Sequence, residues 1–390
     1  MMNAKNSQDF LELLHQTNRG RLKIYIGSVA GVGKTYRMLQ EAHDLKARGA
    51  DVVVAFVETY NRPKTQALVP GLEVIPRKIL SYRNMLIEEM DLDAVLLRKP
   101  QIAIVDELAH TNAPLCKNFK RYQDVIELLM AGINVICAFN IQHLESLNDI
   151  VKNFTDIAVH ETIPDTFLRE ADQVVNVDLA VEDILERLQS GQIYPPEKAK
   201  LAIENFFIPQ NLSKLRELAL IGVAEIIDQS SRMGHPKTFA GSDVCAKARW
   251  MVCFSPKKHS QKVLLRKASR LAGKLNTDWW VVYAQTPKDK PERIDSEKQR
   301  HLYEDLQLAK DLGARIVHLK THNSIEAWID FAHRQHISHL IINRDQASWW
   351  QVLFGLTPLE KLLKKTQRFD VYVVSAHVFK KMSWDYETRE

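Results

Sequence analysis

The stretch Gly31-Val32-Gly33-Lys34-Thr35 follows the apolar run Leu22–Gly27 and precedes Tyr36–Ala42, which has the pattern of a helix. A strand, a glycine-rich turn, a Lys-Thr pair and a helix in this order are typical of a phosphate-binding loop. Glycines let backbone N–H groups approach phosphate oxygens, and the helix N-terminus adds positive potential there. The sequence therefore predicts that this segment binds a nucleoside triphosphate.

The residues of the loop have separate expected roles. The motif predicts that the nucleotide is bound by Gly31, Val32, Gly33, Lys34 and Thr35. Lys34 would place its ammonium on the outer phosphates, and the hydroxyl of Thr35 would be a ligand of Mg²⁺. One position departs from the usual pattern, because Ser28 stands where a glycine is expected. Serine is small enough to allow a tight turn.

A second motif supports the first. The apolar run Ile102–Val105 ends in Asp106 and Glu107, as expected of the strand that carries the magnesium-linked aspartate in such folds. Asp106 would hold Mg²⁺ together with Thr35, and Glu107 would polarise an attacking water as the general base. Asn140 and Gln142, just past a later strand, are candidates for sensing the terminal phosphate.

Composition narrows the class of protein. The chain has 390 residues, 45% of them hydrophobic and 26% charged, which suits a globular protein of two or three domains. The net charge of +5 is small for this length, and no basic helix with interleaved aromatic residues occurs, so nucleic acid is not an expected partner. The longest apolar run, Val52–Val57, is too short to cross a bilayer. The scattered cysteines suggest neither a disulfide framework nor a zinc site, so we expect a cytoplasmic protein.

Short apolar strands alternate with helical patterns from residue 22 onward, which predicts a mainly parallel α/β sheet with helices on both faces. The predicted strands of this first domain are Leu22–Gly27, Asp51–Val57, Leu72–Ile75, Ile102–Val105, Asn134–Phe139, Ile157–His160 and Gln173–Val177. Helical patterns include Tyr122–Ala131 and Val181–Ser190. Because ligands collect outside the carboxyl ends of such strands, we expect Lys34, Glu58, Asp106 and Asn140 to face one crevice.

The alternation stops in the polar segment Asp228–Lys237 and restarts at Arg249. We therefore predict an N-terminal tail (1–20), a nucleotide-binding domain (21–227), a linker (228–248), a smaller domain (249–380) and a C-terminal tail (381–390). The predicted strands of the smaller domain are Trp250–Phe254, Trp279–Ala284, Arg315–Leu319, His339–Ile342 and Val371–Ser375. Its predicted helices are His259–Leu275, Glu292–Leu312, Ser324–His336 and Pro358–Thr366. This pattern predicts a small doubly wound α/β domain.

The run Asp106-Glu107-Leu108-Ala109-His110-Thr111-Asn112-Ala113-Pro114 resembles the signature of the KdpD family, the sensor proteins of bacterial potassium and osmotic-stress control. Other segments are similar to the same family, among them Val57–Thr59, Met90–Ala94, Gln123–Val125, Asn140–Asp149, Glu161–Asp165 and Glu204–Phe207. The resemblance extends over nearly the whole chain. It implies a P-loop NTPase-like sensor domain followed by a universal-stress-protein-like domain.

Typical members of this family continue into membrane helices and a histidine-kinase core, which needs glycine-rich nucleotide boxes. The only Gly-x-Gly of this chain is Gly31-Val32-Gly33, which the phosphate loop uses. The resemblance therefore implies a short form that holds only the cytosolic input half and is not a complete histidine kinase. The implied partners are potassium-transport or sensor-kinase proteins, and such a partner would hold the chain at the periphery of the inner membrane.

Two loops depart from the family pattern. Leu115–Asn118 stand where Gly-Ser-Arg-His is usual, and Thr59 is followed by Tyr60-Asn61 where His-Gly is usual. Both loops could cover a bound nucleotide. The resemblance therefore supports nucleotide binding more directly than nucleotide turnover.

The smaller domain carries weaker ligand signals. Some family members bind cyclic di-AMP in this domain, and Ser255 and Tyr283 fall near the expected contact, but the fuller Ser-x-Ser and Phe-Thr-Ala pattern is absent. Core packing of Trp279, Trp280 and Tyr283 is the preferred interpretation. The loop Asn343–Trp350 contains no glycine, which argues against ATP binding there.

Three functions remain open on the sequence. The first is an ATP-binding signalling module that modulates potassium uptake or osmotic-stress signalling through nucleotide-dependent partner binding. The second is an active Mg-dependent ATPase or phosphotransferase that uses Glu107 as its base. The third is a degenerate scaffold without nucleotide affinity. The sequence indicates no oligomeric state.

Overall fold

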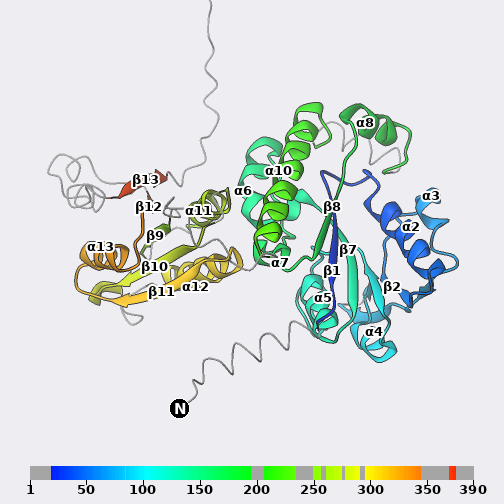
Figure 1. The fold of residues 1–390 in the computed structure, drawn as a ribbon, viewed down its shortest axis with the longest axis horizontal. Helices are drawn as coiled ribbons and strands as arrows, with labels where there is room; N and C mark the ends of the chain where they lie inside the picture. The colour runs from blue at the N-terminus through cyan, green and yellow to red at the C-terminus, as the bar shows by residue number, and fades with distance from the viewer. Residues whose placement is uncertain are drawn as a thin grey trace, which may run out of the picture. The chain divides into compact units, whose positions relative to one another are not determined.

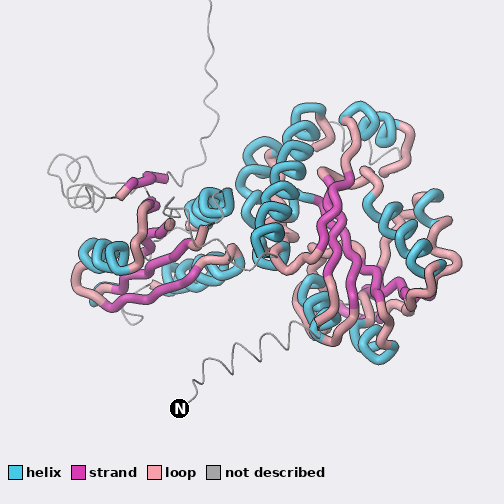
Figure 2. Tube along the Cα trace, in the orientation of Figure 1, coloured by secondary structure: helices cyan, strands magenta, loops and turns pink. Residues whose placement is uncertain are grey.

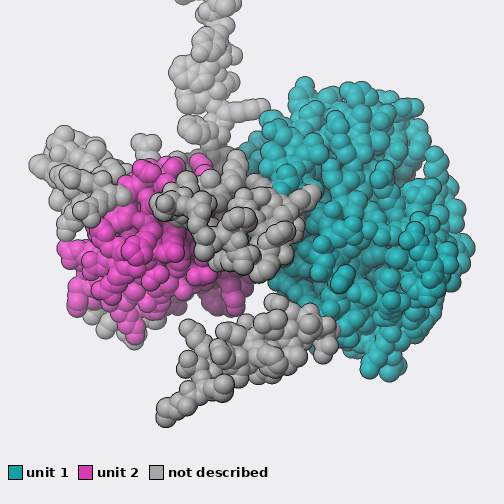
Figure 3. All heavy atoms as spheres, in the orientation of Figure 1, with its two compact units in different colours: residues 1–236 teal, residues 237–390 magenta. Residues whose placement is uncertain are grey.

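The computed structural model describes residues 19–83, 85–194, 206–233, 249–255, 261–274, 277–289, 295–343 and 369–374. The chain divides into two compact units, Met1–Pro236 and Lys237–Glu390, which Figure 3 colours separately. Each unit has its own hydrophobic core, and each is described by itself below.

The first unit is built on a six-stranded sheet in the order β3-β2-β6-β7-β1-β8, in which all pairs of neighbouring strands are parallel (Figures 1 and 2). Its strands are β1 (Leu22–Gly27), β2 (Val52–Phe56), β3 (Glu73–Val74), β6 (Ile102–Val105), β7 (Asn134–Asn140) and β8 (Gln173–Val177). All six coincide with strands predicted from the sequence. Parallel strands need crossover connections, and the helices between them supply these connections.

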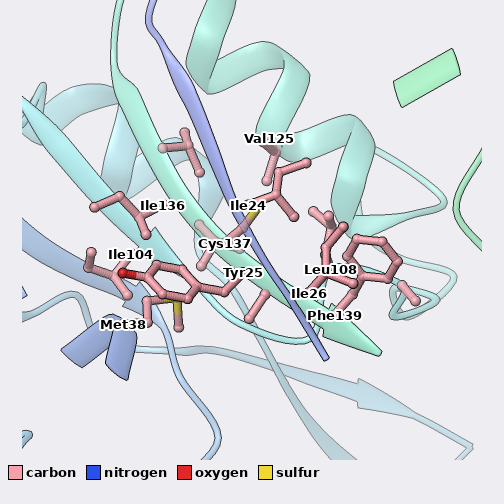
Figure 4. Packing of buried hydrophobic residues seen from close by; sticks show 14 of the residues in the cluster. Ile24, Tyr25, Ile26, Met38, Ile104, Leu108, Val125, Ile136, Cys137 and Phe139 are labelled. Atoms are coloured by element: carbon pink, nitrogen blue, oxygen red, sulfur yellow. The ribbon is translucent and has the colours of Figure 1, made fainter. Parts of the chain in front are cut away.

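Helices lie on both faces of this sheet. They are α2 (Lys34–Ala47), α3 (Pro63–Gln66), α4 (Leu92–Arg98), α5 (Arg121–Met130), α6 (Asn148–Thr155), α7 (Asp165–Leu168), α8 (Val181–Gln189) and α10 (Pro209–Met233), with short 3-10 turns at Ile141–His143 and Glu145–Leu147. Figure 4 shows Met38 of α2 beside Tyr25 and Ile104, while Val125 of α5 lies near Ile24 on the other face. Alternate residues of each strand therefore enter two apolar layers.

Two features of the first unit were not predicted. Strands β4 (Lys78–Tyr82) and β5 (Met85–Glu89) form an antiparallel pair outside the main sheet. In addition, β2 pairs with β6 through a register shift, because Val54 lies opposite Ile104 whereas Phe56 lies opposite the next residue, Val105. Strand β2 thus contains one extra residue at this point, which is a β-bulge.

The predicted strand at Ile157–His160 is wrong. Helix α6 ends at Thr155, Asp156 adopts a left-handed backbone with φ of 57°, and the following residues form no regular element. Side chains satisfy this backbone instead of a neighbouring strand. The amide of Asn148 donates to the carbonyl of Val159 at 2.6 Å, and the carbonyl of Glu161 lies 2.8 Å from His143 Nδ1.

The start of the predicted linker is helical. Helix α10 continues through Asp228 to Met233, and the two units divide after Pro236. The remaining residues of the predicted linker, 234–248, lie outside the described residues.

The second unit contains a five-stranded parallel sheet in the order β11-β10-β9-β12-β13. Its strands are β9 (Trp250–Phe254), β10 (Trp279–Gln285), β11 (Arg315–Lys320), β12 (His339–Asn343) and β13 (Asp370–Val374). Its described helices are α11 (Lys262–Lys274), α12 (Ser296–Asp311) and α13 (Ser324–Arg334), with a 3-10 turn at Pro287–Asp289. The strands agree with the sequence prediction, whereas the predicted helix Pro358–Thr366 and residues 344–350 lie outside the described residues.

Two apolar clusters cover this second sheet. One contains Trp250, Trp279 and Tyr283, and the other contains Trp280 and Trp328. The core packing predicted for Trp279, Trp280 and Tyr283 is therefore confirmed, since none of them is more than 6% exposed. Across the described residues of both units, no helix combines the length and the apolar character needed to cross a membrane.

Candidate functional site

The strand order explains why distant residues share one site. Strand β7 lies between β1 and β6, and all three are parallel, so the ends of these strands lie at one edge of the sheet. Lys34 follows β1, Asn140 ends β7, and Asp106 follows β6. All three line a cavity of about 1060 Å³. The sequence prediction of a shared crevice is confirmed for these three residues. It is wrong for Glu58, which does not line the cavity and instead lies 3.2 Å from Arg77 Nη1.

The phosphate loop occupies one wall of this cavity. Gly31 and Gly33 have φ values of 91° and 105°, in the left-handed region that side chains disfavour. At Gly27 a β-carbon would lie 2.5 Å from Val32 Cγ2, so only glycine fits this close approach. Gly33 precedes the first residue of α2, whose first turn carries no acidic residue and no side-chain cap. The N–H groups at this helix end therefore remain available for an anion.

Lys34 is a buried cation with short-range partners. Its Nζ donates to the carbonyl of Val29 at 3.0 Å and to Oδ1 of Asn140, and the side chain is 8% exposed. Burial lowers the pKa of Lys34 to about 8, against the opposing effect of Asp106 and Glu107. The fold thus holds an ammonium group where its charge is poorly solvated, and an anionic ligand would relieve this cost.

Thr35 and Asp106 lie in contact across the cavity floor. The Thr35 hydroxyl donates to Asp106 Oδ2 at 2.8 Å, and the backbone N–H of Glu107 donates to Asp106 Oδ1 at 2.9 Å. Burial, and then the charge of Glu107, raise the pKa of Asp106 to about 6. A hydroxyl and a carboxylate oxygen at this separation are hard ligands of the kind that Mg²⁺ takes while it keeps several waters. The pair therefore fits a magnesium ion.

Glu107 has a strained backbone. Its φ is 52°, which is uncommon for a residue with a side chain and is often found at functional sites. Its carboxylate accepts a hydrogen bond of 2.9 Å from the hydroxyl of Tyr60, and both residues line the cavity. Tyr60 and the next residue, Asn61, also have positive φ values of 50° and 56°. Two neighbouring segments with positive φ values are thus joined by the hydrogen bond between Tyr60 and Glu107.

Gln142 differs from the other predicted residues. It is absent from the residues that line the cavity, and its Oε1 is buried without a hydrogen-bond partner among the described residues. The other predicted nucleotide-binding residues all line the cavity: Gly31, Val32, Gly33, Lys34, Thr35, Asp106 and Asn140. Glu107, the predicted base, lines it as well.

The structure adds residues that the sequence motifs did not indicate. Arg62 lines the cavity and donates to the carbonyl of Ile193 at 3.2 Å. Arg187 of α8 donates to the carbonyl of Gly31 at 3.1 Å. Ile193 packs on the phosphate loop, because a β-carbon on Gly31 would lie 2.3 Å from Ile193 Cδ1. These contacts join residues far apart in the chain, so no local sequence pattern predicts them.

The segment after Glu107 is fixed by a buried ion pair. Arg121 and Glu89 are 1% and 2% exposed, and Arg121 Nη2 lies 3.0 Å from Glu89 Oε2. Glu89 also accepts from the backbone N–H of Ala113 at 2.8 Å and contacts His110 Nε2 at 3.0 Å. Burial alone would raise the pKa of Glu89, but the hydrogen bonds and charges of these neighbours lower it overall. Residues His110 and Ala113 of the run Asp106–Pro114 therefore fix the position of this segment through Glu89.

Comparison with known proteins agrees with this architecture. The family described as "Osmosensitive K+ channel His kinase sensor domain" (KdpD) matches residues 18–227, more than half of the 390-residue chain. The chain belongs to the KdpD family. The match ends within α10, so it covers the sheet and the cavity of the first unit.

Relatives of this family differ in length. The sensor protein KdpD of Escherichia coli is 43% identical over 348 residues, which are 87% of this chain but 38% of that protein. A KdpD relative from Synechocystis sp. is 38% identical over 358 residues, which are 92% of this chain and 94% of that protein. The chain thus spans well under half of the first relative and nearly all of the second.

Part of this chain matches solved structures of universal stress proteins at low similarity. A crystal structure of a universal stress protein in complex with cAMP is 16% identical, with a TM-score of 0.25, and the match covers 33% of this chain and 98% of that one. The α/β character of the second unit rests on its own five-stranded parallel sheet.

Proposed function

We propose that the first unit binds Mg-ATP and that nucleotide occupancy is the signal this chain passes on. The observation that carries the proposal is the convergence of two buried, oppositely charged groups, Lys34 and Asp106, on a cavity walled by a glycine loop and a helix N-terminus. The cavity volume of about 1060 Å³ is at the upper end of the range of small-molecule sites, about 300–1,000 Å³. It is large enough for a nucleotide.

The residues of the site would divide the ligand between them. The loop N–H groups and Lys34 would bind the phosphates, and Thr35 and Asp106 would hold the magnesium ion. That ion, when bound, neutralises charge on the outer phosphate oxygens. Oδ1 of Asn140 accepts a hydrogen bond from Lys34. It would lose this donor to the phosphates and would thereby respond to their arrival.

The output would pass through the segment that begins at Glu107. Its strained backbone joins the site directly to the loop that runs through Thr111 to Lys120. A shift of Glu107 on nucleotide binding would change how this loop presents itself to a partner. By the chain's membership of the KdpD family, we infer that the partner is a sensor-kinase or potassium-transport protein at the membrane.

Replacement of Lys34 tests the binding site. Lys34→Ala removes a charge-assisted contact of about 1.5–3 kcal/mol, so we expect at least about a tenfold loss of ATP affinity. Isothermal titration calorimetry with Mg-ATP measures this loss. Lys46→Ala, in the last turn of the same helix, is the matched control and should bind like the wild type. Equal affinities of the wild type and Lys34→Ala would contradict the proposal, and a wild type that does not bind any nucleotide would favour the scaffold.

A slow ATPase is the second candidate, and the placement of Glu107 favours it. This carboxylate directly follows Asp106, the proposed magnesium ligand, and lines the same cavity. If it is the general base, Glu107→Gln should bind Mg-ATP with unchanged affinity and release phosphate more slowly, by a factor of about 10²–10⁴. Steady-state phosphate release and calorimetry on the same preparation separate the two effects. Equal loss of binding and turnover would assign Glu107 a structural role.

A further inference from the structure

Arg62 is a cation of the cavity that the roles assigned above leave unused. It lies in the segment between strand β2 and helix α3, directly before the helix. It lines the cavity. Its Nη2 donates to the carbonyl of Ile193 at 3.2 Å. Its Nε is buried and has no hydrogen-bond partner among the described residues. A buried N–H donor without a partner is uncommon and points to a ligand.

Two contacts place Arg62 at the Glu107 end of the cavity. The guanidinium lies over the ring of Tyr60, with its carbon 5.2 Å from the ring centre. The hydroxyl of Tyr60 in turn donates to Glu107 at 2.9 Å. The charge of Arg62 also reaches Lys34, since it adds to the dominant effect of burial in lowering the pKa of Lys34. Two cations, Lys34 and Arg62, thus act on the same part of the cavity as the carboxylates of Asp106 and Glu107.

The backbone before Arg62 is shaped for this placement. Tyr60 and Asn61 both have positive φ values, 50° and 56°, and the N–H of Arg62 donates to the carbonyl of Thr59 at 2.9 Å. Non-glycine residues in this region cost about 1–3 kcal/mol each and persist where the surrounding structure requires them. Here the strained turn brings the guanidinium from the end of strand β2 into the cavity.

We propose that Arg62 binds the terminal phosphate of ATP, as an arginine supplied by the same chain, and that it ties this phosphate to the segment at Ile193. The inference rests on the proposed function. Lys34 and Arg62 would share the terminal phosphate, and charge-assisted, forked hydrogen bonds suit a guanidinium for this role. Because Ile193 packs on Gly31, the same arginine would link the phosphate loop, the ligand and the segment after α8.

The proposal predicts discrimination between triphosphate and diphosphate. ADP lacks the group that Arg62 would contact. Lys34 would also reach the phosphate before it, and the loop N–H groups would bind phosphates that both nucleotides share. Arg62→Ala should therefore lose about tenfold to a hundredfold in affinity for the non-hydrolysable analogue AMP-PNP. Its affinity for ADP should change by less than about threefold. Arg62→Lys should fall between the wild type and Arg62→Ala, because a lysine keeps the charge but not the fork.

The test is calorimetry of the full chain with Mg-AMP-PNP and Mg-ADP. Lys64→Ala is the matched control, because Lys64 is a cation two residues after Arg62, inside α3, and it also lines the cavity. Its replacement should weaken both nucleotides to the same small extent. Arg62→Gln keeps donors for the Ile193 carbonyl without the charge, and it should behave like Arg62→Ala if the phosphate contact is what matters.

Each outcome decides between the readings. If Arg62 is only structural, its replacement should lower the affinities for both nucleotides equally or leave both unchanged. An unchanged ratio of the two affinities would therefore overturn the inference. If Arg62 instead contacted the nucleotide base, its replacement would lower the affinities for both nucleotides equally. A wild type that binds neither nucleotide would overturn the proposed function itself. If Lys34→Ala lowers the affinity for both nucleotides, the proposed function is supported, independently of the result for the Arg62 variants.

Discussion

Asp106 is a carboxylate that the fold keeps away from water. Burial, with the nearby charge of Glu107, raises its pKa from 3.8 to about 6. The folded protein therefore holds this proton more tightly than the unfolded chain does. The contribution of Asp106 to stability is fully present below about pH 4 and is lost as the pH rises to about 6. Near neutral pH the ionised side chain lowers the stability of the nucleotide-free protein.

Replacement by asparagine removes this dependence. Between pH 4 and pH 6 we expect the free energy of unfolding of Asp106→Asn to rise, relative to the wild type, by about 1–3 kcal/mol, because asparagine does not titrate. Urea unfolding of the nucleotide-free proteins at several pH values measures the difference. Above pH 6, Mg-ATP should stabilise the wild type and have much less effect on the variant. A difference between the two proteins that does not vary with pH would contradict this assignment.

At the scale of elements, the loop between β6 and α5 is held from two sides. Glu89, the last residue of β5, and Arg121, the first residue of α5, form the buried pair beneath it. Arg121 also lies over the ring of Phe56, with its guanidinium carbon 3.8 Å from the ring centre. The β4–β5 pair, which stands outside the main sheet, is therefore anchored through its last residue.

Breaking this pair should cost more than removing it. Arg121→Ala leaves Glu89 buried without the guanidinium that pairs with it, and we expect it to lower the free energy of unfolding by about 3–5 kcal/mol. The double variant Glu89→Leu/Arg121→Met removes both charges and keeps most of the volume, so it should be clearly less destabilised. Chemical denaturation of both proteins gives the comparison. A double variant at least as unstable as the single one would contradict the view that unpaired charge is the main cost.

Apolar runs predicted the strands of both sheets because strands covered on two faces are continuous in hydrophobicity. The same rule failed at Ile157–His160, where side chains of Asn148 and Thr155 form hydrogen bonds with backbone groups that a strand would have paired. It also missed β4 and β5, whose residues are mostly exposed and show no hydrophobic pattern. Local composition does not reveal which backbone groups the tertiary structure will satisfy.

The site was predictable where phosphate chemistry fixes residue type and spacing. Lys34, Thr35 and Asp106 belong to motifs, and the structure brings them together. Arg62 was not predictable, because its contact with Ile193 joins residues 131 positions apart. The burial of Arg121 was equally hidden, since an arginine at the start of a helix normally indicates the surface.

At the scale of the whole molecule, two units with separate cores share one chain. The first is centred on the six-stranded sheet and the second on the five-stranded sheet, and no buried residue belongs to the clusters of both. Only the first contains the candidate nucleotide site. Ligand binding should therefore stabilise the units unequally.

Differential scanning calorimetry of the full chain tests this independence. We expect two unfolding transitions, of which saturating Mg-ATP raises only one, by the equivalent of about 2.7 kcal/mol at a hundred times the dissociation constant. Lys34→Ala is the control, and its transitions should not respond. A single transition, or an equal shift of both, would show instead that the two units unfold as one.

The extra residue in β2 has a consequence for how this protein can change over time. Side chains of a strand alternate between faces, so one inserted residue exchanges the faces of everything that follows it. Phe56 meets the guanidinium of Arg121 only because Ala55 is accommodated in the bulge. Deletion of that alanine would keep the strand order of the sheet. It would move Phe56 and the residues that follow it, on the way to Arg62, to the opposite face. An insertion in a loop around the site would change the length of that loop. A change at Ala55 would change which face of the sheet each following side chain occupies.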